Sequence, residues 1–124
     1  MKIDRAIEKY VAALKKNNCE ITNIVNNPVY LNGRITPVCF LEFIKNNYIY
    51  LTLLELDFKG NVTNLKINTT YEKLYKHRDN YKEFKGTFPI IVIATKDKSI
   101  RYNSKNFELV YTDLEYSNLE YFLF

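Results

Sequence analysis

The sequence predicts an α/β (α+β) fold, a mixed β-sheet flanked by helices, on three observations. The hydrophobic period is helical over residues 3–17 and changes to two from Glu20. Residues 48–58 are apolar at nearly every position, which is typical of a central strand covered on both faces. A helical segment over 71–85 separates that run from a second apolar run, 88–95. Strand, crossover helix and strand in succession imply a parallel pair with the helix on one face.

The N-terminal part is expected to form a helix followed by a hairpin. Apolar side chains recur at helical spacing at Ile3, Ile7, Tyr10, Val11 and Leu14, which predicts an amphipathic helix over 3–17. The two-residue alternation predicts a strand over 20–26. Asn32-Gly33 is the dipeptide of a type I′ turn, and residues 35–43 continue as β-rich sequence. We therefore predict a hairpin that turns at Asn32-Gly33.

The rest of the chain is expected to complete the sheet. A second turn at 45–47 leads into the central strand over 48–58. Thr69 and Thr70 are candidate caps of a helix over 71–85. One stripe of this helix contains Tyr71, Leu74, Arg78 and Tyr81, with Phe84 at its edge. Residues 88–95 and 107–112 are expected to be strands, and Asp113 is a candidate N-cap of a short helix that closes the chain.

The composition of the chain limits the classes of function that it can have. The chain has 124 residues, 47% of them hydrophobic, and is expected to form one domain over 1–124. With three glycines it has no phosphate-binding loop, and two isolated cysteines with one histidine make a poor zinc site. The start lacks the apolar core of a signal peptide, and no apolar run approaches the ~20 residues that span a bilayer. We expect a cytoplasmic protein with no membrane contact, whose thiols are free and mostly buried.

Positive charge is concentrated in one region. The net charge is +4 overall, but residues 59–101 hold ten Lys and Arg against four acids. Nearby aromatic residues make this a candidate nucleic-acid surface, carried by Lys59, Lys66, Lys73, Lys76, Arg78 and Lys82. The alternative is an ordinary solvated helix face. His77 has no partner at a catalytic spacing and is interpreted as a surface or boundary histidine.

Two carboxylates lie near the end of the central strand. Glu55 and Asp57 are two residues apart, so they project from one strand face and could converge on a divalent cation such as Mg²⁺. The alternatives are that the strand end exposes both, or that Lys66 or Lys73 pairs with them. No organic cofactor and no catalytic residue are assigned.

The chain resembles the replication-relaxation family, whose restriction-endonuclease-like domain is carried by plasmids and other mobile elements. The resemblance covers residues 34–101: Arg34 to Leu41, Tyr50 to Phe58, Leu65-Lys66, Lys73 to Tyr75, Phe88 to Thr95 and Arg101. It implies a core of helix, hairpin, Glu-bearing strand, helix and strand.

The departures from this pattern matter for activity. The family's acid after Pro37 is here Val38, and Glu42 lies four residues further on, about 13 Å along a strand. The lysine of the Glu-x-Lys motif is displaced to Lys59, because Asp57 stands in its place. Metal-dependent cleavage needs an acid cluster and a base, of which at most half is present.

We therefore expect a non-catalytic, nuclease-like DNA-binding protein of a plasmid, phage or other mobile element, acting in replication or transfer. One alternative is a divergent Mg²⁺-dependent nuclease that uses Glu55 and Asp57 with Lys66 or Lys73 and an extra acid, Glu8 or Glu42. A second alternative is a protein-interaction module, such as a phage-encoded inhibitor, that binds through the aromatic and acidic tail over 111–124.

Overall fold

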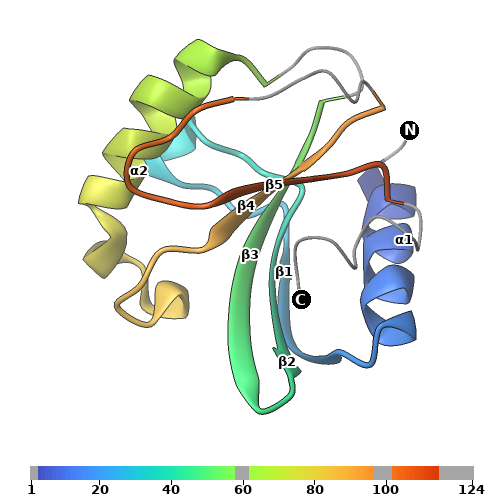
Figure 1. Cartoon of the computed structure of the whole chain (residues 1–124). Helices are drawn as coiled ribbons and strands as arrows, with labels where there is room; N and C mark the ends of the chain where they lie inside the picture. Colours follow the sequence, from blue (N-terminus) through green and yellow to red (C-terminus); the bar gives the residue numbers. More distant parts are fainter. Residues whose placement is uncertain (1–2, 58–61, 97–101, 115–124) are drawn as a thin grey trace.

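A five-stranded mixed sheet lies between helices on its two faces (Figure 1). The structure is a computed structural model that describes residues 3–57, 62–96 and 102–114. Its main elements are α1 (Ile3–Lys16), β1 (Glu20–Asn26), β2 (Cys39–Lys45), β3 (Tyr48–Leu56), α2 (Glu72–Lys76), β4 (Ile90–Ala94) and β5 (Leu109–Thr112). The strands lie in chain order; β1 to β3 are antiparallel, and β3 to β5 are parallel. The predicted α/β class, central strand and parallel pair are confirmed.

Alternate residues of β3 face the two helical layers. Leu54 packs in the cluster beneath α1, and Leu51 and Leu53 pack in the cluster beneath the helical segment that contains α2. On the α1 side the Tyr10 hydroxyl donates to Thr52 Oγ1 at 2.9 Å, and Thr52 donates to the Leu41 carbonyl oxygen at 2.9 Å. Burial raises the pKa of Tyr10, so the hydroxyl keeps its proton and can donate. Both faces of β3 are therefore core from Leu51 to Glu55. Tyr48 and Ile49, at the start of the strand, are exposed, so the predicted cover on both faces holds for only part of the strand.

The two cysteines are free and buried on the α1 side of the sheet. Burial raises the pKa of the Cys39 thiol to about 12, so this group is a small hydrophobic side chain and not a nucleophile. The predicted burial of both thiols is confirmed.

The predicted hairpin turn at Asn32-Gly33 is wrong in its placement. The ladder between β1 and β2 begins with Asn26 opposite Cys39, so residues 27–38 form a long loop. Asn32 lies within that loop, in a left-handed turn closed by an isolated bridge between Tyr30 and Ile35. The loop holds Pro28 and Pro37, which have no N–H for a ladder.

The type I′ geometry occurs instead between β2 and β3. Both residues of the two-residue turn have positive φ, 52° at Asn46 and 68° at Asn47. Asparagine tolerates this backbone region because its short polar side chain can bond locally. The second turn at 45–47 was predicted, but not as the type I′ turn.

The crossover helix begins earlier than predicted. The Thr63 hydroxyl accepts a hydrogen bond from Lys66 N at 3.1 Å and caps a helical segment that starts at Asn64. The segment continues as a π-helix over Lys66–Tyr71 and ends as α2, after which single 3₁₀ turns run over Arg78–Asn80 and Lys82–Phe84. The expected caps are therefore wrong, since Thr69 bonds the Leu65 carbonyl oxygen within the π-helix. The apolar stripe is confirmed at Tyr71, Leu74 and Phe84, which are fully buried, whereas Arg78 and Tyr81 are half-buried.

The final predicted helix, which follows Asp113, lies outside the described residues. Within the described ranges, no helix has the length and apolar character needed to cross a membrane.

Candidate functional site

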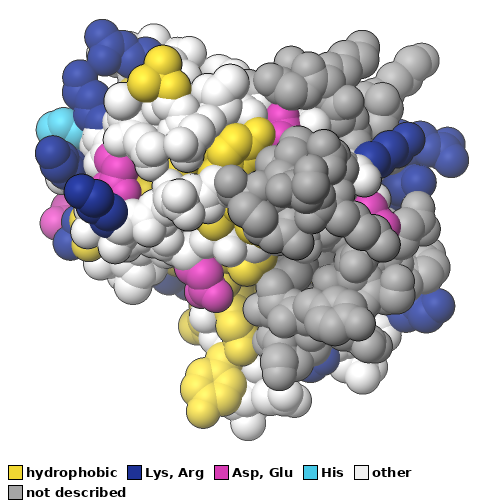
Figure 2. Space-filling view, turned by 45° about the horizontal axis from the view of Figure 1, so that its top comes forward, with side chains coloured by type: hydrophobic (Ala, Val, Ile, Leu, Met, Phe, Trp, Pro, Cys, Tyr) yellow, Lys and Arg dark blue, Asp and Glu magenta, His cyan; other side chains and the backbone are white. Residues whose placement is uncertain are grey.

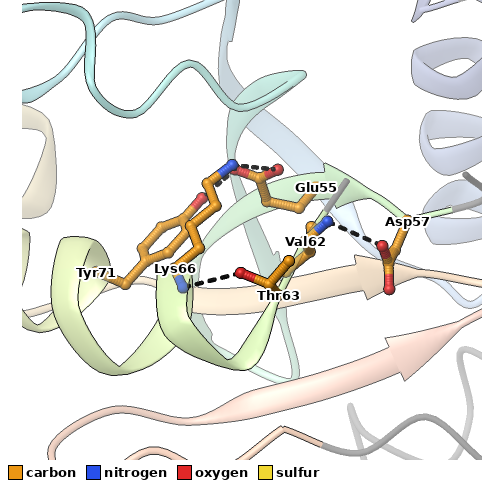
Figure 3. Close-up of polar contacts among 6 residues, drawn as sticks. All are labelled: Glu55, Asp57, Val62, Thr63, Lys66 and Tyr71. Carbon is orange, nitrogen blue, oxygen red and sulfur yellow. Dashed lines mark hydrogen bonds and ion pairs between the residues drawn. The ribbon is translucent and has the colours of Figure 1, made fainter. Parts of the chain in front are cut away.

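Glu55, near the carboxyl end of β3, is enclosed by two side chains from the crossover segment (Figure 3). Lys66 Nζ donates to both carboxylate oxygens at 3.2 Å, and the Tyr71 hydroxyl donates to Oε1. Glu55 is 6% exposed and Tyr71 is fully buried. Burial, and then the Glu55 carboxylate, raise the pKa of Tyr71, so its hydroxyl stays protonated as a donor. The three side chains form a closed group, in which the charge of Glu55 is balanced inside the protein.

The π-helix explains how Lys66 and Tyr71 reach the same carboxylate. Residues five apart in an α-helix differ by about 140° around the axis, since the helix has 3.6 residues per turn. The π-helix over Lys66–Tyr71 has a wider turn, which brings these two residues toward one face. A segment of α-helix at this place would turn one of the two partners away from Glu55.

Asp57 is satisfied by different partners. Its Oδ1 accepts a hydrogen bond from Val62 N at 2.9 Å, and its Oδ2 lies 2.7 Å from the Tyr102 hydroxyl, which donates to it. The side chain is 2% exposed and points away from Glu55 (Figure 3). Asp57 therefore ties the segment after β3 to the strand end, and the expected convergence of the two carboxylates is not what the structure shows.

Within the described part of the chain, the acids that metal-dependent cleavage needs are not brought together. Among the residues that the structure describes, no three His, Cys, Asp or Glu side chains are grouped so that they could hold a metal ion. Val38 precedes β2, and its N–H donates to the carbonyl oxygen of Leu54, the residue before Glu55, at 2.8 Å. The register of β2 and β3 places Glu42 opposite Leu51, four residues from Glu55. Glu8 is exposed on α1, which covers the other face of the sheet (Figure 1). Of the interpretations open from the sequence, the pairing of Glu55 with Lys66 is the one observed.

Glu42 has a structural role of its own. Lys85 Nζ lies 2.8 Å from its Oε1, and the Thr22 hydroxyl donates to its Oε2 at 2.6 Å. These two hydrogen bonds, first that of Lys85, lower the pKa of Glu42 below its usual value of 4.5 and outweigh the effect of burial.

We expect the Lys85→Met variant to lose about 0.5–1 kcal/mol of stability at pH 7, because the lysine is half exposed and water screens the pair. A folded-state pKa below 4.5 means that this stabilisation is full above the unfolded-state value and is lost as the pH falls through the folded-state value. Urea unfolding of both proteins should therefore show a difference at pH 7 that shrinks below pH 4.5. A difference that stays constant down to pH 2 would contradict this assignment.

The basic residues predicted to bind nucleic acid differ in how available their charges are. Lys59 lies outside the described residues, and Lys66 is held by Glu55. The Arg78 guanidinium stacks on the Tyr75 ring at 4.2 Å and donates to the Tyr75 carbonyl oxygen. Lys73, Lys76 and Lys82 are exposed. Figure 2 shows Lys and Arg side chains gathered around the single histidine at one side of the molecule.

Lys73 lines a cleft that also contains residues from the β1–β2 loop. The cleft has a volume of about 570 Å³. Its polar lining consists of Arg34, Lys73, His77, Asn32, Asn80 and Tyr81. Lys76 lines a separate cleft that contains Glu72. The basic segment therefore presents its cations on two sides, and one side meets the loop.

The sequence prediction did not include Arg34 among the candidate binding residues, and it assigned His77 to the surface without a role; both line the cleft. The spacing of Lys73 and His77, four residues apart at the end of a helix, was a usable signal because such residues share a helix face. Nothing in the sequence placed Arg34 at the same cleft, since it lies about 40 residues before Lys73 and His77 in the chain.

Searches of protein-family models, of curated proteins and of solved structures found no match to this chain.

Proposed function

We propose that the protein is a non-catalytic DNA-binding protein with a restriction-endonuclease-like core. The observation that carries the proposal is the set of cations at the cleft. The side chains of Arg34, Lys73 and His77 make no hydrogen bond or ion pair to any residue that the structure describes, and all three are exposed. The charges of Arg34 and Lys73 are therefore available to phosphate groups, which supply most of the affinity of DNA binding.

The proposal that the protein does not cleave DNA is based on the partners of the two carboxylates, Glu55 and Asp57. Glu55 and Asp57 already have protein partners, and among the residues that the structure describes no third acid joins them in a metal-binding group. A metal ion at Glu55 would have to displace the Lys66 ammonium group, which lies 3.2 Å from the carboxylate. Binding without cutting is the function that these contacts favour.

The order of elements supports the fold family named in this proposal. Helix, three antiparallel strands, helix and parallel strand follow one another, as the resemblance to the replication-relaxation family implies. A role in the replication or transfer of a plasmid, phage or other mobile element is the biological context that this resemblance suggests.

Fluorescence anisotropy with a random-sequence duplex and a single strand, at 50 and 200 mM salt with Mg²⁺ or chelator, tests the proposal. We expect salt-sensitive binding and intact DNA under both conditions. The Arg34→Gln/Lys73→Gln variant should bind about 10- to 100-fold more weakly at low salt and reduce the magnitude of the salt slope by about two, roughly one for each phosphate contact.

The matched control is Arg5→Gln/Lys15→Gln, which removes the same charge from exposed positions of α1 on the other side of the sheet. If overall charge alone attracted DNA, both variants would lose affinity equally, and the proposed surface would be wrong. Absence of binding at 50 mM salt would refute DNA binding altogether. Mg²⁺-dependent cutting that Glu55→Ala abolishes would replace the proposal with the nuclease alternative.

A further inference from the structure

We propose that the cleft between the β1–β2 loop and the end of α2 binds a nucleotide through its terminal phosphate monoester. The nucleotide could be the phosphorylated end of a DNA strand or a free nucleotide, and both present the same group. The strand-end form of this inference rests on the proposed function, whereas the free-nucleotide form does not.

The charge of the cleft fits an anion. Arg34 and Lys73 carry fixed positive charges, His77 adds a third basic group, and none of the described residues that line the cleft is an acid. The other described cleft of similar volume, about 550 Å³, contains Glu72, whose carboxylate accepts a hydrogen bond from Asn106 at 2.6 Å. The first cleft therefore carries a net positive charge, whereas in the second cleft the Glu72 carboxylate offsets part of the positive charge.

A terminal phosphate matches this site better than a phosphate within a strand. A phosphate monoester carries about −1.5 to −2 charges at pH 7, whereas an internal phosphodiester carries one. The cleft supplies a guanidinium fork and an ammonium group for the charge. The amide groups of Asn32 and Asn80 and the Tyr81 hydroxyl add neutral hydrogen-bonding groups around them.

The two walls of the cleft are held together by contacts that need no ligand. Leu31 N donates to the Tyr81 hydroxyl at 3.1 Å, which joins the loop to the helical segment across 50 residues. Behind this bond, Tyr30 packs edge-on against the Tyr81 ring, with ring centroids 4.9 Å apart. Leu31 also adopts φ of 51°, which is costly for a residue with a side chain and persists only where surrounding contacts hold the loop. The backbone walls of the cleft are therefore held in place before a ligand binds, whereas the exposed side chains of Arg34 and Lys73 become ordered on binding.

The end of α2 does not oppose an anion at this place. Helix C-termini carry partial negative charge on unpaired carbonyl groups. Here the Leu74 carbonyl oxygen accepts from His77 N, and the His77 carbonyl oxygen accepts from Asn80 N, each at 3.0 Å. The Tyr75 carbonyl oxygen accepts from the Arg78 guanidinium at 2.9 Å. These bonds leave the cationic side chains to set the potential of the cleft.

The volume points to more than a bare phosphate ion. About 570 Å³ falls within the roughly 300–1,000 Å³ typical of small-molecule sites, and Leu31 with the Tyr81 ring gives the cleft an apolar part. A phosphate held by Arg34 and Lys73 would leave this part for a sugar or a base. The class of ligand is therefore a nucleotide with a terminal phosphate.

Anisotropy with two labelled single strands of one sequence, one with a 5′-phosphate and one with a 5′-hydroxyl, tests the strand-end form. We expect the phosphorylated strand to bind about tenfold more tightly, as charge-assisted hydrogen bonds to one additional group would give. Lys73→Gln should abolish this preference. Lys76→Gln is the matched variant, because it removes a lysine of the same segment outside the cleft and should weaken both strands while leaving their ratio near ten.

Titration of the full chain with AMP, adenosine and inorganic phosphate, followed by NMR shifts of the Asn32 and Asn80 side-chain amides, tests the free-nucleotide form. AMP is expected to shift both amides in the wild type and neither in Lys73→Gln, and adenosine is expected to shift neither.

The outcomes separate this inference from the proposed function. DNA binding without any 5′-phosphate preference, together with no AMP-induced shift, refutes the inference and leaves DNA binding intact. AMP binding without DNA binding refutes the proposed function and supports the cleft as a nucleotide site. Equal shifts with AMP and inorganic phosphate would identify an anion site only and overturn the nucleotide assignment.

Discussion

Replacing Phe84 with alanine is expected to destabilise the protein by about 3–5 kcal/mol, the cost of a large cavity in a packed core. Phe84 is fully buried, and its ring contacts those of Tyr30, Phe40, Tyr81 and Phe88, with centroids 5.3–6.1 Å apart. Domains of this size are stable by about 5–15 kcal/mol, so the loss is a large share of the total. Urea unfolding followed by circular dichroism measures it.

The control for Phe84→Ala is Tyr48→Ala, since Tyr48 is an aromatic residue that is 69% exposed near the β2–β3 turn. Its removal should change the free energy of unfolding by no more than about 0.5 kcal/mol. Because Tyr30 and Tyr81 rest on Phe84, the Phe84→Ala variant should also lose the 5′-phosphate preference at temperatures where it remains folded. Similar costs for the two variants would mean that the aromatic cluster does not hold the crossover segment on the sheet.

Replacing Lys66 with methionine is expected to cost about 2–3 kcal/mol, because it leaves the buried Glu55 carboxylate without its cation. Tyr71 alone then has to satisfy that carboxylate. Adding Glu55→Gln to Lys66→Met should recover part of the loss, since a neutral amide needs no counter-charge. A double-mutant cycle in urea gives the coupling energy of the pair.

Lys76→Met is the control, because Lys76 is an exposed lysine of the same segment. The Lys66→Met variant also tests the metal question directly. If Glu55 and Asp57 could hold a divalent ion, 10 mM Mg²⁺ would stabilise this variant, in which the competing ammonium group is gone. We expect no shift in the unfolding midpoint; a rise confined to Lys66→Met would restore the metal site as an interpretation.

Hydrophobic period alone was enough to place most of the elements. The helix over 3–17, the strand over 20–26 and the central strand appear as α1, β1 and β3, each with ends within about two residues of the prediction where the structure describes them. The apolar pattern is local and is set by which face of each element is buried, so it can be read without the partner element. The parallel pairing of β3 and β4 could be predicted as well. Parallel strands need a crossover connection, and a helix lies between these two apolar runs.

Turn and cap predictions were weaker because several local sequences compete for the same role. Asn32-Gly33 and Asn46-Asn47 both suit a type I′ turn, and the turn is found at Asn46-Asn47. Both pairs adopt positive φ. Strand pairing, which ends at Cys39 and Asn26, decided between them. Thr63 caps the crossover helix in place of Thr69 or Thr70, because Tyr71, which contacts the buried Glu55, lies within a helix that starts about two turns earlier than predicted.

The sequence by itself determined the fold class, the buried face of most elements and the region where positive charge is concentrated. Each of these features depends on residues that are close together along the chain. Only the tertiary structure decided what the charged groups do. It turned Lys66 inward to Glu55 through a π-helix and brought Arg34 beside Lys73. Such pairings join residues that the chain separates by 11 to about 40 positions, and their energies depend on burial and direction, which a one-dimensional pattern does not contain.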